Sequence, residues 1–253
     1  MLPCISVSNI IIMTIQLIFK CSNIVLFRIT LIYVINIILI AMPSSLSQKL
    51  LTEFIGTFFL SLTICTAAVY GSGGDYAPFG IAATLMVMIY AGGNISGAHY
   101  NPAVTVSIYL RGACEKDEVL PYIASQVLAA VSAALVVENL LFPNEPSPGM
   151  QALGSEAVVA ELLFTFALAY VILNVATTES TSDNGYYGAA IALVVLAGAI
   201  TVGSISLASF NPAVTSALIL SGKISFTNSW MHFAPQFAGA ILATYVYKYT
   251  INN

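Results

Sequence analysis

Two copies of the tripeptide Asn-Pro-Ala are the part of the sequence best suited to specific chemistry. They comprise Asn101, Pro102 and Ala103, and Asn211, Pro212 and Ala213. Proline is favoured in the first turn of a helix, because its missing N–H would have no partner there. An asparagine before it can cap the helix with its side-chain oxygen, which leaves the NH₂ group to donate to a solute. Each motif therefore predicts a helix that begins at the proline, with donors at its tip.

The residues around each motif are expected to form an irregular loop that exposes main-chain carbonyl oxygens. A row of acceptors beside a pair of donors suits water and other small neutral solutes. Two helix N-termini aimed at one point also place about half a positive charge each there, which repels protons and cations. The carbonyl candidates are Gly97, Ala98, His99, Leu207, Ser209 and Phe210.

The composition predicts a membrane protein. Of 253 residues, 58% are hydrophobic and 7% charged, and the mean hydropathy is +0.92. Soluble domains carry about 25% charged residues, so this chain cannot build a water-facing surface of that kind. A net charge of −4 gives no basic surface for nucleic acid. Four scattered cysteines and two histidines make a disulfide framework, a metal site, a cofactor or an enzymatic site unexpected.

Charge-free runs give the expected membrane-spanning helices, each of which needs about 20 residues. Four runs fit one span: Phe54–Gly74, Val119–Val137, Leu162–Thr178 with a start near Ala157, and Ile224–Tyr247. Two others, Tyr76–Leu110 and Asn184–Gly222, have 35 and 39 residues, too many for one span and too few for two. Each carries Asn-Pro-Ala about ten residues before its end, which predicts a full helix, a re-entrant loop and a half-length helix. The expected fold class is all-α, with six transmembrane helices and two re-entrant half-helices.

An internal repeat organises these elements. Gly93–Leu110 and Gly203–Leu220 are identical at ten of 18 positions, at a constant offset of 110. Each copy has three full spans, an odd number, so the second copy must be inverted relative to the first. Inverted repeats of this kind place a site at the midplane, where the half-helices meet. We expect a channel domain over residues 49–250, with repeats at about 49–140 and 154–249.

The N-terminal region is expected to be separate from this domain. Residues 1–48 form an extension, and Ile29–Met42 resembles the apolar part of a signal sequence. Residues 1–41 are interpreted as dispensable or as a mis-assigned start. The distribution of Lys and Arg predicts that both termini of the channel domain are cytoplasmic. The expected location is the plasma, or cell inner, membrane.

The repeated motifs resemble those of the aquaporin, or major intrinsic protein, family. The resemblance rests on SGAHYNPAVT, on the second Asn-Pro-Ala, and on the paired segments TEFIGTF and AELLFTF. It implies the aquaporin fold, usually a homotetramer with one pore per subunit, in which Asn101 and Asn211 are the midplane donors. It also implies an outer filter made of Ile81, Ala199, Ala208 and Val214.

The expected filter departs from the family pattern at Val214, where the family usually has arginine. The four positions are apolar and uncharged, and this predicts a wider pore that admits water and also glycerol, urea or ammonia. An ion-conducting pore and a coupled secondary transporter remain alternatives, since the filter lacks its arginine and transporters share the inverted-repeat design.

Two further sets of residues have open interpretations. Glu53 and Glu161 lie inside predicted spans, where a carboxylate is costly and usually functional. They either brace the re-entrant loops, as the resemblance implies, or relay protons. His99 either packs within its loop or acts as a pH gate.

Overall fold

The computed structural model describes residues 44–146 and 148–251. The N-terminal extension expected over residues 1–48 falls largely outside this part of the chain, so that expectation stays a prediction. Residues from Leu46 onward form one compact unit. All of its regular elements are helices, within the residues that the structure describes.

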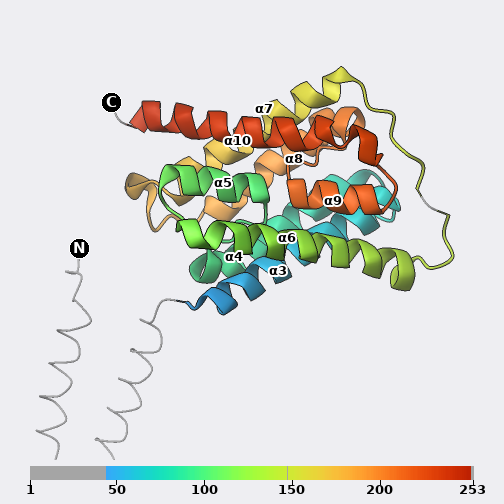
Figure 1. The fold of residues 1–253 in the computed structure, drawn as a ribbon, viewed down its shortest axis with the longest axis horizontal. Helices are drawn as coiled ribbons and strands as arrows, with labels where there is room; N and C mark the ends of the chain where they lie inside the picture. Colours follow the sequence, from blue (N-terminus) through green and yellow to red (C-terminus); the bar gives the residue numbers. More distant parts are fainter. Residues whose placement is uncertain (1–43, 147, 252–253) are drawn as a thin grey trace, which may run out of the picture. The chain divides into compact units, whose positions relative to one another are not determined.

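Six long helices form the frame of this unit (Figure 1). Their bounds are α3 Leu46–Thr63, α4 Ala77–Ser96, α6 Lys116–Val136, α7 Ser155–Ala176, α8 Tyr187–Ser206 and α10 Trp230–Ile251. Two are extended by π-helical turns, α3 by Ile64–Val69 and α6 by Val137–Leu141. Short 3₁₀ turns at Gly74–Tyr76, Glu179–Thr181 and Phe226–Asn228 lie in the connections.

Two short helices begin at the prolines, as the sequence predicts. These are α5 (Pro102–Arg111) and α9 (Pro212–Leu220). Figure 1 shows α5 near the C-terminal end of α10 and α9 near its beginning, so the two short helices occupy opposite halves of the bundle. The expected arrangement of six long and two half-length helices is confirmed within the described residues.

The helices pack in pairs that repeat. α3 packs against α6 in the first copy and α7 against α10 in the second, while α4 and α8 contact each other between the copies. The α7–α10 contact is close because α10 has a glycine there. A Cβ at Gly239 would lie 2.4 Å from the carbonyl oxygen of Leu162. Small residues at such positions let helix backbones approach in a membrane.

The helix bounds differ from the charge-free runs at their ends. α3 and α6 include Lys49 and Lys116 in their first turns, because a helix continues into the polar boundary where lysine is solvated. α10 begins at Trp230 rather than Ile224, after a 3₁₀ turn. Five of the six long helices are apolar enough to span a membrane by composition alone, whereas α10 is equally long but less apolar, with His232 and Gln236 in its first half.

Candidate functional site: two re-entrant loops and one cavity

Two loops that precede the short helices share one backbone conformation. We call residues 97–101 the first loop and residues 207–211 the second loop. Positive φ angles occur at equivalent positions, at Gly97, Ala98 and Tyr100 (85°, 52° and 50°) and at Leu207, Ala208 and Phe210 (68°, 48° and 48°). This left-handed conformation costs a residue other than glycine about 1–2 kcal/mol. Surrounding bonds must therefore hold both loops in place.

A buried carboxylate holds the first loop. Glu53 on α3 is fully buried, and its Oε1 accepts from Ser96 Oγ at 2.6 Å and from the His99 N–H at 2.9 Å. Its Oε2 accepts from the Tyr100 N–H at 2.7 Å and from Gln126 Nε2 at 2.8 Å. Two main-chain N–H groups of the loop thus end on one side chain from a neighbouring helix.

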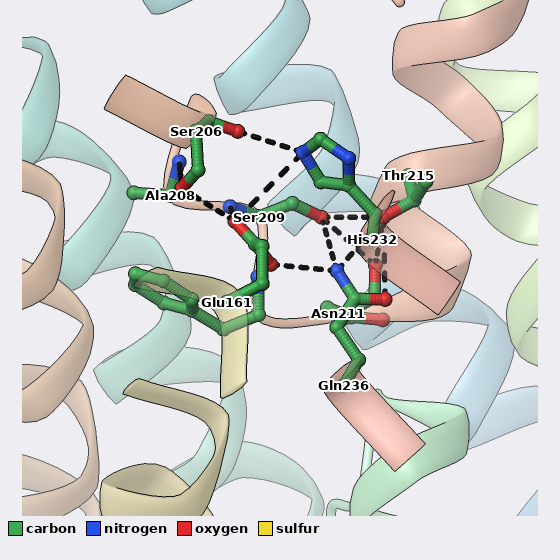
Figure 2. Close-up of polar contacts among 9 residues, drawn as sticks. Glu161, Ser206, Ala208, Ser209, Asn211, Thr215, His232 and Gln236 are labelled. Atoms are coloured by element: carbon green, nitrogen blue, oxygen red, sulfur yellow. Dashed lines mark hydrogen bonds and ion pairs between the residues drawn. The ribbon is translucent and has the colours of Figure 1, made fainter. Parts of the chain in front are cut away.

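The second loop is held by the same four bonds (Figure 2). Glu161 on α7 is also fully buried, and its Oε1 accepts from Ser206 Oγ at 2.7 Å and from the Ser209 N–H at 3.0 Å. Its Oε2 accepts from the Phe210 N–H at 2.7 Å and from Gln236 Nε2 at 2.8 Å. A carboxylate with four donors is used as an acceptor throughout, which agrees with the interpretation of both residues as braces.

The braces determine which way the loop carbonyls point. In a trans peptide, the N–H of one residue and the C=O of the residue before it point in opposite directions. Because the His99 and Tyr100 N–H groups point at Glu53, the carbonyls of Ala98 and His99 point away from it. The Ala98 N–H points at Ser96 Oγ, which turns the Gly97 carbonyl in the same way.

The equivalent peptides of the second loop are turned alike. The N–H groups of Ala208, Ser209 and Phe210 point at Ser206 Oγ and Glu161. The carbonyls of Leu207, Ala208 and Ser209 therefore point away from the brace. Each loop thus aims three consecutive carbonyl oxygens away from its carboxylate.

The two asparagines cap the short helices and also tie the loops together. Asn101 Oδ1 accepts from the Ala103 N–H at 2.9 Å, and Asn211 Oδ1 accepts from the Ala213 N–H at 2.9 Å. Each NH₂ group donates one bond across to the other loop. Asn101 Nδ2 donates to the Phe210 carbonyl at 2.9 Å, and Asn211 Nδ2 to the Tyr100 carbonyl at 2.8 Å. One N–H of each amide remains for a solute.

Behind the two loops, different side chains occupy equivalent positions. The Tyr122 hydroxyl donates to the Ser96 carbonyl at 2.9 Å, whereas His232 Nε2 donates to the Ser206 carbonyl at 2.7 Å. His232 is fully buried, its Nε2 lies 3.8 Å from Glu161 Oε1, and its Nδ1 has no hydrogen-bond partner among the described residues.

Each loop also inserts an aromatic ring against glycine. A Cβ on Gly56 would lie 2.2 Å from the Tyr100 ring, and one on Gly198 would lie 2.4 Å from the Phe210 ring. The Tyr100 hydroxyl in addition donates to the Met88 carbonyl at 2.9 Å. The close contact with glycine leaves either ring little room to shift.

A cavity of about 960 Å³ passes between the loops. Both asparagines line it, as do all four residues of the expected outer filter, Ile81, Ala199, Ala208 and Val214. Gly97, Ala98, His99, Leu207 and Ser209, which were expected to supply carbonyls, line it too. Among the described residues that line it, Asp183 is the only Asp, Glu, Lys or Arg.

Several expected site residues lie behind this wall. Pro102, Ala103, Pro212 and Ala213 are buried in the first turns of α5 and α9, and the two glutamates are buried behind the loops. Phe210 is also fully buried, and its carbonyl is occupied by Asn101. We therefore leave Phe210 out of the carbonyl row and include Ala208.

His99 lies in the first loop and lines the cavity. Its Nδ1 lies 3.2 Å from Thr105 Oγ1, and its ring lies 5.1 Å from that of Tyr122. Ser209 occupies the equivalent position in the second loop and bonds to Thr215 Oγ1 at 2.7 Å. In each copy the side chain at this position thus contacts a threonine of the following short helix. This agrees with a packing role for His99.

Known proteins share the sequence features that carry this arrangement. The family model described as "Major intrinsic protein" matches residues 41–199 and 179–253. The chain belongs to the major intrinsic protein family. It is therefore an integral, multi-pass membrane protein, and its buried loops and short helices are the family's paired re-entrant elements.

Relatives in the major intrinsic protein family come from distant organisms. The chain is 34% identical over 215 residues to the probable aquaporin NIP4-2 of Arabidopsis thaliana, covering 81% of this chain and 75% of that protein. It is 31% identical to aquaporin AqpM of Methanothermobacter thermautotrophicus, covering 81% and 98%. The aquaglyceroporin structure from Plasmodium falciparum superposes with a TM-score of 0.69 at 22% identity, covering 82% of this chain and 97% of that one.

Sequence reasoning assigned no role to the side chains that complete the braces. Ser96 and Ser206, and likewise Gln126 and Gln236, are pairs at the repeat offset of 110, and each pair bonds the equivalent carboxylate. The offset itself was the signal that could have found them.

Proposed function

We propose that the protein is a passive transmembrane channel for water and small neutral solutes, and that its pore is the cavity between the two loops. The observation that carries this proposal is the lining of that cavity. It combines two asparagine amides and two rows of carbonyls with largely apolar walls, and within the part of the chain that the structure describes Asp183 is its only lining Asp, Glu, Lys or Arg. Such a lining hydrogen-bonds a neutral solute and offers little to an ion.

The electrostatics of the two short helices support exclusion of cations. α5 and α9 both begin next to the asparagine pair, whose amides are linked to the opposite loops. Each N-terminus contributes about half a positive charge at this point. This argues against a cation pore. A coupled transporter would need several ionisable groups along the pathway. Among the described lining residues, Asp183 and His99 are the candidates, and neither belongs to an ion pair. This argues against ion coupling.

The outer filter supports a pore that is not restricted to water. Ile81, Ala199, Ala208 and Val214 offer no side-chain donor or acceptor, and two of the four are alanines. A ring of this kind selects by size rather than by hydrogen bonding. We therefore propose that neutral solutes up to the size of glycerol, such as urea and ammonia, pass together with water.

We further propose a homotetramer in the plasma membrane with both ends of the channel domain in the cytoplasm. Large apolar side chains on the outer surface support contact with lipid or with neighbouring subunits, for example Leu51, Phe59, Leu128, Leu163 and Ile200, which are 43–62% exposed. The proposed orientation rests on four basic residues at helix ends. Lys49 and Lys116 lie in the first turns of α3 and α6, and Arg111 and Lys248 lie in the last turns of α5 and α10.

Stopped-flow light scattering on proteoliposomes tests the channel and its filter together. A sucrose gradient reports water permeability, and a glycerol gradient reports glycerol permeability. We expect the wild-type protein to accelerate both, and Val214→Arg to lower glycerol permeability at least fivefold while water changes less than about twofold, because arginine narrows the ring and adds donors. Val214→Met is the matched control that adds length without charge, and we expect it to have a smaller effect.

Two results would contradict this proposal. A folded wild-type protein that accelerates neither water nor glycerol would overturn the channel function. A wild-type protein that excludes glycerol and urea, but passes water, would overturn the broad filter and leave the channel.

A further inference from the structure

A second ring of apolar residues lies in the same cavity, at positions related to the outer filter by the internal repeat. The helices that carry the filter correspond without gaps, since α4 and α8 begin at Ala77 and Tyr187 and end at Ser96 and Ser206, each pair 110 residues apart. α5 and α9 begin at the same offset. Every filter position therefore has a mate in the other copy.

The four mates are Ile89 for Ala199, Ala98 for Ala208, Val104 for Val214 and Ile191 for Ile81. All four line the cavity. Because the copies are inverted and α5 and α9 occupy opposite halves of the bundle (Figure 1), these mates lie on the other side of the asparagine pair from the outer filter. We call these four residues the inner ring.

The two rings differ in one side chain. Position for position, isoleucine, alanine and valine recur, but the inner ring has Ile89 where the outer filter has Ala199. A sec-butyl group replaces a methyl group, so the inner ring has less open cross-section. Solvent exposure differs at the exchanged position, where Ile89 is 3% exposed and Ala199 is half-buried. The remaining isoleucine and the valine are buried in both rings.

We propose that the inner ring is the narrower constriction of the pore, and that Ile89 determines the largest solute that passes. The inference rests on the proposed channel function. The outer filter admits solutes up to the size its two alanines allow, and the inner ring then excludes those too wide to pass the isoleucine. Because the side chains of both rings carry no donor or acceptor, the selection is by width and by the partial loss of hydration in a passage with apolar walls.

A reciprocal exchange between the two rings tests this proposal. Ile89→Ala gives the inner ring the composition of the outer filter, and Ala199→Ile does the reverse. The measurement is permeability to erythritol, a four-carbon polyol, relative to water in proteoliposomes. We expect Ile89→Ala to raise this ratio at least threefold. We expect the double variant to return it towards the wild-type value, because the narrow ring then lies on the other side of the asparagines.

Two further variants keep the result interpretable if Ile89→Ala folds poorly. Ile89→Val removes one methylene and should raise the ratio in the same direction, by a smaller factor. Val87→Ala is the matched control, because Val87 lies on the same helix but is 51% exposed on its outer surface, and it should leave the ratio unchanged.

The outcomes separate the inner ring from the channel itself. If the folded wild-type protein passes water but Ile89→Ala and Ile89→Val leave the erythritol ratio unchanged, the inner ring is not the constriction and the proposal is overturned. If the wild-type protein passes no water above protein-free liposomes, the channel function is overturned, and the inner ring with it.

Discussion

The first and second loops reach one geometry with partly different side chains. Both place two main-chain N–H groups, one serine hydroxyl and one glutamine amide on a buried glutamate. Beyond these donors the copies diverge, with Tyr122 against His232 behind the loop and His99 against Ser209 within it. The difference teaches that the site requires a fixed set of donors around each carboxylate, while the residues behind that set need only fill space and reach one carbonyl.

The largest test of this equivalence is to convert each brace to its amide. In Glu53→Gln or Glu161→Gln, an NH₂ group replaces one acceptor oxygen and faces donors, so at least one buried bond is lost. Each change should cost about 3 kcal/mol, since bonds to charged groups are the stronger ones. For a chain of this size that is a fall in Tm of about 6–12 °C in detergent. Water permeability should fall in both.

Glu156→Gln is the control for this pair, because Glu156 lies exposed in the first turn of the same helix as Glu161. It should change the Tm by no more than about 2–4 °C. A result in which one brace variant melts like the wild-type protein, while the other unfolds, would end the interpretation of the two loops as equivalent.

The second test concerns the aromatic rings of the loops. Gly56→Ala and Gly198→Ala each force a Cβ into the ring of Tyr100 or Phe210. Overpacking of this kind costs about 1–3 kcal/mol. We expect Gly56→Ala to be the more damaging, because the Tyr100 hydroxyl is bonded to the Met88 carbonyl and its ring cannot shift freely. Thermal unfolding in detergent measures both.

Gly80→Ala supplies the matched control on α4. A Cβ there meets nothing within 4 Å, so the change should leave the Tm unchanged or raise it slightly, as alanine favours helix over glycine. Equal losses at Gly56 and Gly198 would show that the tyrosine hydroxyl adds no rigidity to the first loop.

The smallest expected effect concerns the connections after the two short helices, where one copy has a cysteine that can be alkylated and the other has isoleucine. Cys114 lies after α5, and Ile224 is at the equivalent place after α9. Burial, with a smaller contribution from Glu118, raises the pKa of the Cys114 thiol to about 11. Since only the thiolate reacts, alkylation by iodoacetamide should be slow at pH 8 and should accelerate about tenfold per pH unit up to pH 10.

Peptide-level mass spectrometry after a short iodoacetamide pulse measures this rate. Cys65, which is fully buried, should stay unmodified over the same range and react only after denaturation. Fast modification of Cys114 at pH 7.5 would contradict the partial burial of its thiol.

Much of the fold could be predicted because its determinants are local. Pro102 and Pro212 begin α5 and α9, and the lengths of the charge-free runs separate full helices from half-length ones. The repeat offset shows two copies, and the odd number of full spans in each copy then gives the inverted arrangement. These features depend on single residues or on neighbours in sequence, which is where pattern reasoning is strongest.

The details of the site could not be predicted in the same way, because they depend on contacts between distant residues. The bond from Asn101 to Phe210 joins residues 109 apart, and that from Asn211 to Tyr100 joins residues 111 apart. Nothing in either motif indicates that one N–H of each amide is used to tie the loops. The burial of Phe210 also depends on distant residues, since its ring packs against Gly198 and Phe164.

The carbonyl rows have a consequence for how such a channel can change over evolution. Their direction is set by main-chain N–H groups held on Glu53 and Glu161, so no side chain of Ala98, His99, Ala208 or Ser209 supplies the acceptors. Mutation of these loop side chains leaves the polar path intact as long as the backbone keeps its shape. If Ile89 and Val214 have the roles proposed above, substitutions there can change the range of solutes without disturbing the two rows of carbonyls.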